Sequence, residues 1–207
     1  MNSLQGLTEN REEVRELIRA VRMKLPSVKQ MLETIGTDND KSIIDILTAY
    51  SMIGVSSMVG KDREVKELLG YFHRLISGIK TPMSPEAIGM CLKSLKGIKT
   101  SENEIRALLE VLESQIRAVP SNDVFSTIDI GNCMLGLYCS SSDSPQVLDI
   151  LQTLTRRIRA STDSFNSESL GSVLLGMRCL SSEHIEVRML LSALTEKIRT
   201  SENGEFK

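Results

Sequence analysis

The sequence contains the stretch Leu170-Gly171-Ser172-Val173-Leu174-Leu175-Gly176-Met177, and its pattern of apolar and small residues recurs along the chain. The pattern appears 40 residues earlier as Ile130-Gly131 with Gly136-Leu137. It appears a further 42 residues back as Ile88-Gly89 with Leu95. The apolar positions follow the 3.6-residue period of a helix, so each copy predicts a short α-helix, which we call helix A.

A second recurring pattern follows each helix A. Its last copy begins at Glu186-Val187-Arg188, and its apolar residues are spaced i, i+3, i+4, i+7 and i+11. Such a stripe with a polar back is typical of an amphipathic helix, which we call helix B. Earlier copies begin at Glu104-Ile105-Arg106, Glu64-Val65-Lys66 and Glu13-Val14-Arg15.

Self-similarity at a spacing of 40–42 residues indicates stacked two-helix units. We expect an all-α protein, a right-handed α-solenoid of about four and a half units in one domain. One unit offers roughly ten core side chains, too few to offset the entropy of ordering about 40 residues, so neighbouring units must bury each other's faces. The domain covers residues 1–199, with units at about 1–25, 43–78, 84–118, 126–160 and 166–199, an insertion at 26–42 and a polar tail at 200–207.

Start signals for the helices stand in register. Ser84, Ser126 and Asn166 occupy one repeat position just before helix A, where a side-chain oxygen can accept hydrogen bonds from the first turn. Pro85 follows at the favoured first helical position. Asp143 and the Gln three residues after it predict a capping box for one helix B.

The glycines of helix A lie on both sides of its apolar stripe. At 3.6 residues per turn, Gly171 and Gly176 stand about 110° to either side of the stripe, as do Gly131 and Gly136. Glycine inside a helix costs about 1 kcal/mol relative to alanine. We therefore expect these positions to serve the close approach of adjacent helices.

The composition is that of an ordinary globular protein. The 207 residues are 41% apolar and 25% charged, and 25 Lys+Arg against 27 Asp+Glu give a net charge of −2. This balance supplies no long-range field that would recruit nucleic acid or an anionic membrane. No apolar run approaches the roughly 18–20 residues of a membrane helix, and the N-terminal residues lack the apolar stretch of a signal peptide. We expect no membrane partner.

Candidate catalytic residues are few. His73 and His184 stand at non-equivalent repeat positions, without a nucleophile motif, a metal-binding motif or a phosphate-binding loop. The four cysteines form no CxxC pair, which favours structural thiols in a reducing, intracellular setting, either the cytoplasm or the interior of an organelle. We expect no enzyme, no catalytic or metal site and no cofactor.

The face of helix A opposite its core stripe is the candidate binding surface. Its residues differ from unit to unit and several are apolar, so stacking does not require them and a partner can contact them. The alternative is that a third layer of the protein or another chain covers this face. We expect a partner to contact Tyr50, Ile53, Met90, Lys93, Asn132, Leu135, Ser172 and Leu175, and the same face carries Glu86, Ile128 and Glu168.

A row of arginines indicates a different ligand. Arg117, Arg159 and Arg199 stand in register, one residue past the last apolar residue of helix B, and Arg156 and Arg157 stand beside the second of them. A stepwise row of guanidinium groups can contact the phosphates of RNA. Cations at helix C-termini also offset the helix dipole, and acidic residues at the opposite ends of these helices favour that explanation.

Two repeat families are similar to these patterns. Helix A, in the stretch Leu170–Met177, resembles the octotricopeptide and heptatricopeptide repeats, which implies an organellar RNA-binding solenoid with helix A on its inner face. Helix B, in Glu186-Val187-Arg188 and its copies, is similar to the second helix of HEAT-type repeats, whose period matches. That resemblance implies a protein-binding scaffold. Either likeness covers most of residues 43–199.

We expect a non-catalytic scaffold that binds a protein or peptide through the helix A face. Proteins that bind RNA usually offer basic grooves and planar side chains, whereas this face has one Tyr and one Lys. Single-stranded RNA binding is the alternative function. A further alternative is a fragment or subunit of a longer solenoid, because neither end carries an obvious polar cap and end-to-end self-association would cover such an end.

Overall fold

The computed structural model describes residues 63–79, 81–98 and 103–200, together with Glu16, Ala20 and Met23. Within these residues the protein contains seven α-helices and no strand, so the predicted all-α class is confirmed for this part of the chain. The helices are α3 (Arg63–Ser77), α4 (Pro85–Ser94), α5 (Asn103–Ala118), α6 (Thr127–Gly136), α7 (Pro145–Ala160), α8 (Ser167–Gly176) and α9 (Ile185–Thr200).

Short and long helices alternate along the chain. The predicted helix A corresponds to α4, α6 and α8, which have 10 residues each. The predicted helix B corresponds to α5, α7 and α9, with 16 residues each, and to α3.

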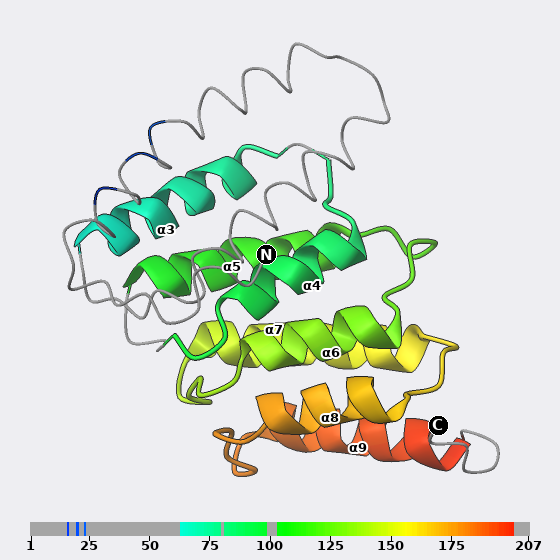
Figure 1. Cartoon of the computed structure of the whole chain (residues 1–207). Coiled ribbons are helices and arrows are strands. Elements are labelled where there is room, and N and C mark those ends of the chain that lie inside the picture. The colour runs from blue at the N-terminus through cyan, green and yellow to red at the C-terminus, as the bar shows by residue number, and fades with distance from the viewer. Residues whose placement is uncertain are drawn as a thin grey trace.

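The helices form two layers. In Figure 1, α4, α6 and α8 lie side by side in front, and α3, α5, α7 and α9 form the layer behind them. Each helix contacts its counterpart in the next unit, and α4 also contacts α5, as α6 contacts α7. This packing of adjacent helices is compatible with a helical repeat.

The core is aliphatic and follows the predicted stripes. The helix B positions that recur in the sequence are buried in both α5 and α7, and the stripe of helix A is buried in α4 and α6. One further column was not predicted: Met83, Phe125 and Phe165, each just before the helix A cap, are also buried. An apolar residue at this position often packs against the first turn of the helix and fixes the angle at which the chain enters it.

Glycines bring neighbouring short helices into close contact, as the sequence predicts. A Cβ atom added at Gly136 would lie under 3.0 Å from the carbonyl oxygen of Leu92, and one added at Gly176 would lie equally close to that of Met134. Real Cβ atoms do not approach so closely. The backbones of α4, α6 and α8 therefore touch where a side chain larger than hydrogen cannot fit.

The predicted caps of helix A are confirmed. Ser84 Oγ accepts a hydrogen bond from the backbone of α4, and Ser126 with Asp129 forms a complete capping box at α6. Asn166 caps α8 in the same way. The cap predicted at Asp143 is wrong, because α7 begins one residue later, at N-cap Ser144, whose side chain makes no cap hydrogen bond.

A column of long polar side chains ties each unit to the one before it. Gln115 Oε1 accepts a hydrogen bond of 2.9 Å from the backbone N–H of Met83. At the equivalent position one unit later, Arg157 donates to the carbonyl oxygens of Ile116 and Val119, and Lys197 donates to that of Ser161. The bonds of Arg157 and Lys197 satisfy carbonyl groups at or just beyond the end of the preceding long helix, and the bond of Gln115 satisfies a backbone N–H in the connector before α4.

Candidate functional site

The six described residues of the predicted contact surface lie on three neighbouring helices. Met90 and Lys93 belong to α4, Asn132 and Leu135 to α6, and Ser172 and Leu175 to α8. Because these helices lie side by side, the six positions form two parallel rows across the layer. Tyr50 and Ile53 lie outside the described residues.

The row of Lys93, Leu135 and Leu175 is the more open of the two. Lys93 is exposed, Leu135 is half-buried, and 40% of Leu175 is accessible to solvent. On the same face Ile128 is 60% exposed, and Glu86 and Glu168 at the equivalent positions are also exposed. Apolar and charged side chains therefore share this face.

The other row lies partly between units. Met90, Asn132 and Ser172 are half-buried. A Cβ atom at Gly89 would lie 3.3 Å from Cβ of Asn132, and one at Gly131 would lie 3.4 Å from Cβ of Ser172. Asn132 and Ser172 thus pack beside the glycine of the preceding helix, and a partner reaches only their outer parts.

A third row, which the sequence analysis missed, extends the face beyond the helix ends. Tyr138 follows α6, and its ring centroid lies 5.6 Å from Lys96 Nζ and 5.9 Å from Arg178 Cζ. Arg178 Nη1 also donates a 2.9 Å hydrogen bond to the Tyr138 hydroxyl. The three residues occupy one repeat column, 42 and 40 residues apart, so the spacing could have revealed them. They give this edge of the face a positive charge.

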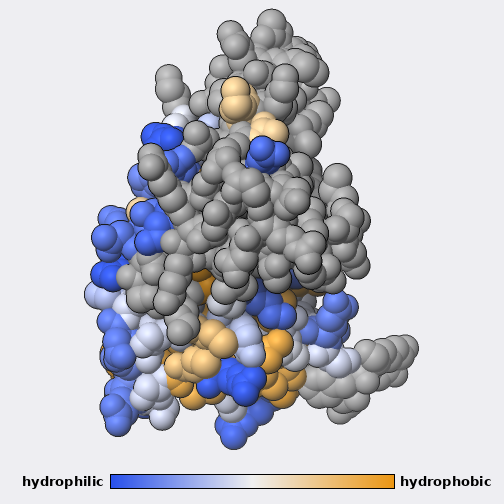
Figure 2. Space-filling model, turned by 60° about the vertical axis from the view of Figure 1, so that its left-hand side comes forward, coloured by the Kyte–Doolittle hydropathy of each residue, from blue (hydrophilic) through white to orange (hydrophobic). Residues whose placement is uncertain are grey.

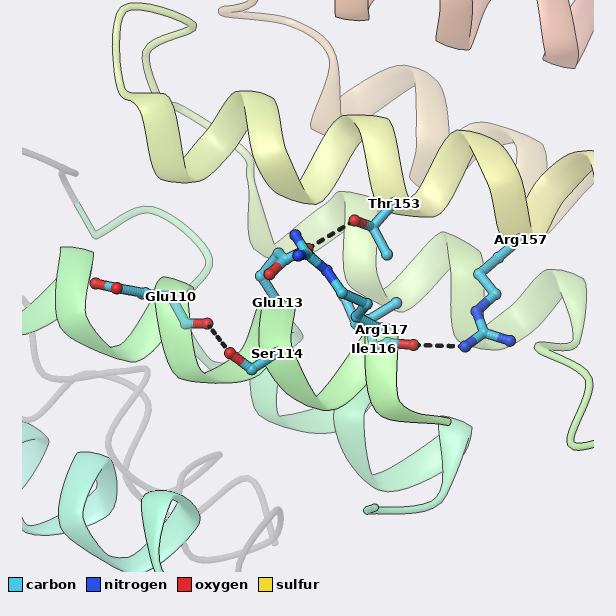
Figure 3. Close-up of polar contacts among 7 residues, drawn as sticks. All are labelled: Glu110, Glu113, Ser114, Ile116, Arg117, Thr153 and Arg157. Atoms are coloured by element: carbon cyan, nitrogen blue, oxygen red, sulfur yellow. Dashed lines mark hydrogen bonds and ion pairs between the residues drawn. The ribbon is translucent and has the colours of Figure 1, made fainter. Parts of the chain in front are cut away.

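Two of the five arginines of the predicted phosphate row are engaged within the fold (Figure 3). Arg117 pairs with Glu113 at 2.7 Å, and the hydrogen bond and charge of that carboxylate raise the pKa of Arg117. Arg157 donates to backbone carbonyls, and burial lowers its pKa. Arg117 is nevertheless exposed, as are the remaining members, Arg156, Arg159 and Arg199.

Glu113 is a buried carboxylate that joins two units. Thr153 Oγ1 on α7 donates a 2.7 Å hydrogen bond to Glu113 Oε1 on α5, the oxygen that also receives Arg117 (Figure 3). This pair was not predicted from the sequence. Burying a carboxylate in the apolar layer of helix B costs free energy unless hydrogen-bond donors surround it. Thr153 and Arg117 are these donors here.

The remaining reactive side chains are dispersed. Cys91 and Cys133 are buried in α4 and α6, and burial raises the pKa of the Cys133 thiol well above its usual value. Cys139 and Cys179 are exposed. His184 Nε2 lies 3.7 Å from Asp143 Oδ1 at the surface, and His73 is half-buried in α3.

Two properties of the described residues bear on ligands. Among them, no group of three or more His, Cys, Asp or Glu side chains is placed to hold a metal ion. None of their helices is both long and apolar enough to cross a membrane. In comparisons with known proteins, no family model, curated protein or solved structure matches the chain.

Proposed function

We propose that the protein is a non-catalytic helical-repeat scaffold, an α-solenoid that binds a protein or peptide partner through the exposed face of its short helices. The observation that carries this proposal is the set of accessible apolar side chains on that face, where Ile128 and Leu175 are exposed and Leu135 is half-buried beside charged residues. Mixed apolar and charged surface of this kind is typical of protein–protein contact.

The charged residues of the face indicate which side chains a partner would carry. Glu86 and Glu168 lie at the beginnings of their helices, whereas Lys93, Lys96 and Arg178 lie at or beyond the ends. A segment that crosses the short helices along the row of Lys93, Leu135 and Leu175 would contact apolar side chains on α6 and α8. Acidic residues of that segment would pair with Lys96 and Arg178 beside Tyr138.

Single-stranded RNA binding is the rival function. It requires a row of free cations, whereas Arg157 is held by backbone carbonyls and the exposed Arg117 is already paired with the carboxylate of Glu113. Tyr138 offers one planar ring, but that ring is already flanked by Lys96 and Arg178. These contacts favour a protein or peptide over a phosphate backbone.

The repeat itself supplies variants that test the proposal without disturbing the fold. Ile128→Glu places in α6 the residue found at the equivalent positions of α4 and α8, and Leu175→Lys copies Lys93. We expect the double variant to lose capture of a protein partner from a cell extract, while its thermal unfolding stays unchanged. Capture should survive ribonuclease treatment.

The matched control removes exposed positive charge. Arg156→Ala, Arg159→Ala and Arg199→Ala together should leave capture intact, and Arg117 is kept because it pairs with the buried Glu113. If the arginine variant lost binding and the apolar variant kept it, the RNA function would replace this one. Binding to RNA would also weaken steeply with salt, because each phosphate contact releases counterions.

A further inference from the structure

Charges of opposite sign border the face of the short helices on two sides. Glu86, in the first turn of α4, and Glu168, in the first turn of α8, are both exposed. The exposed Ile128 of α6 lies at the equivalent position between them. We call the row of Glu86, Ile128 and Glu168 the negative edge.

The opposite border of the face is positive. Beyond the ends of α4 and α8, Lys96 Nζ and Arg178 Cζ lie 5.6 and 5.9 Å from the ring centroid of Tyr138. Lys93, in the last turn of α4, adds a third exposed cation. We call the row of Lys96, Tyr138 and Arg178 the positive edge. Figure 2 views the molecule from the side where the short helices end in Figure 1, and it shows apolar and hydrophilic residues intermixed at the surface of the lower part.

The spacing of the apolar side chains between the edges matches the width of a helix. Ile128 and Leu135 stand seven residues apart on α6, which is about 10.5 Å along its axis. An α-helix with its side chains is about 10–12 Å wide, so a helix lying across the short helices can contact both. An extended strand needs only about 4.8 Å and would cover one of the two rows. The residues between them, Met90, Asn132 and Ser172, are half-buried and do not hold a helix away from the face.

We propose that this face binds an amphipathic helix of a partner protein, which lies across α4, α6 and α8 with basic residues along one flank and acidic residues along the other. The proposal rests on the proposed function and specifies its partner. The basic flank pairs with Glu86 and Glu168, and the acidic flank pairs with Lys96 and Arg178. These two cations are no more than about 12 Å apart, so acidic residues seven positions apart on the partner helix, about 10.5 Å, reach both.

Two synthetic peptides of the same composition test the proposal on the full chain. Each has an apolar stripe and about 18 residues, which as a helix span about 27 Å and cross three helices packed roughly 8–10 Å apart. The first peptide carries lysines on one flank and glutamates on the other, whereas the second carries both residues on both flanks. In fluorescence anisotropy, the first should bind at least about tenfold more tightly. About 0.5 M NaCl should remove most of that difference, because salt screens exposed charges.

Reversal of the negative edge tests the pairing itself. Glu86→Lys with Glu168→Lys makes both edges positive, so a third peptide with glutamates on both flanks should bind this variant more tightly than it binds the wild type. The first peptide should bind the variant at least about fivefold more weakly than the wild type. Glu110→Lys with Asp149→Lys is the matched control, because it makes the same change in charge at exposed positions of α5 and α7, in the layer behind. It should leave both affinities unchanged.

Three results would overturn the proposal. They are equal binding of the first two peptides or no binding of either, no gain for the third peptide on the reversed variant, and a dimer of the wild type that Ile128→Glu dissociates in sedimentation velocity. The last result would mean that a second copy of the chain covers the face. The proposed function is tested separately, because capture of a partner that Ile128→Glu with Leu175→Lys abolishes would stand even if the peptides bound equally.

Discussion

At the scale of single residues, the glycines of the short helices have different surroundings, even within one helix. Gly136 and Gly176 allow backbones to touch, whereas Gly171 meets open space. All three lie in or at the end of helices of the same length and sequence type. Their substitutions therefore separate the cost of a close contact from the general cost of glycine in a helix.

Gly136→Ala should destabilise the protein by about 1–3 kcal/mol, because the added methyl group overlaps the carbonyl of Leu92 and the helices must move apart. Gly171→Ala is the matched control, and it should leave stability unchanged or raise it by up to about 1 kcal/mol through helix propensity. Chemical denaturation of both variants measures the difference in the free energy of unfolding. Equal effects of the two substitutions would show that the short helices do not pack as described.

At the scale of helices, the short helices α4, α6 and α8 each begin at a side-chain cap, whereas the long helix α7 does not. Ser126 and Asp129 exchange hydrogen bonds with each other's backbone at α6, at 2.9 and 3.2 Å. Ser144 at α7 makes no such bond and uses Pro145 in the first turn instead. Proline needs no acceptor for a backbone N–H and is already restricted to helical φ, so a helix can begin without a cap.

Ser126→Ala should cost about 0.5–2 kcal/mol, because the first turn of α6 loses an acceptor and Asp129 loses a donor. Ser144→Ala, at the equivalent boundary of α7, should change stability by less than about 0.5 kcal/mol. Thermal or denaturant unfolding of the two variants provides the comparison. A larger loss at Ser144 than at Ser126 would contradict the assignment of the caps.

The helices could be predicted because local physics determines them. Apolar periodicity, caps and glycines recur at fixed spacing, so the short and long helices of the described units appear where the sequence places them. The ties between units could not be predicted in the same way. At one repeat position, Gln115 accepts from a backbone N–H, whereas Arg157 and Lys197 donate to backbone carbonyls, and a search for identical residues does not find them.

The candidate surface was predictable as a face but not in its detail. Helical periodicity places Leu135 and Leu175 on one side, and the structure leaves both accessible to different extents. How deeply Asn132 and Ser172 are held between units depends on how closely the helices approach, which only the packing of neighbours determines. The positive edge around Tyr138 lies in the turns, where the helical period carries no signal and only the repeat spacing of 40–42 residues relates Lys96, Tyr138 and Arg178.

At the scale of the whole molecule, stability should be shared between neighbouring units. The helices of one unit contact mainly those of the units before and after it, and hydrogen bonds such as that from Thr153 to Glu113 cross the same boundaries. In a stack of this kind, each unit is stabilised by its own core and by the surfaces it shares. Loss of core volume in one unit should therefore loosen both of its neighbours.

Hydrogen exchange of Leu151→Ala tests this account most directly. Leu151 is fully buried in α7, so its truncation should cost about 2–5 kcal/mol and speed exchange in α5 and α9 as well as in α7. Leu191→Ala, the same change at the equivalent position of α9, is the control and should cost less because Leu191 is partly exposed. Faster exchange confined to residues 126–160 in Leu151→Ala would contradict the stacking of mutually stabilising units.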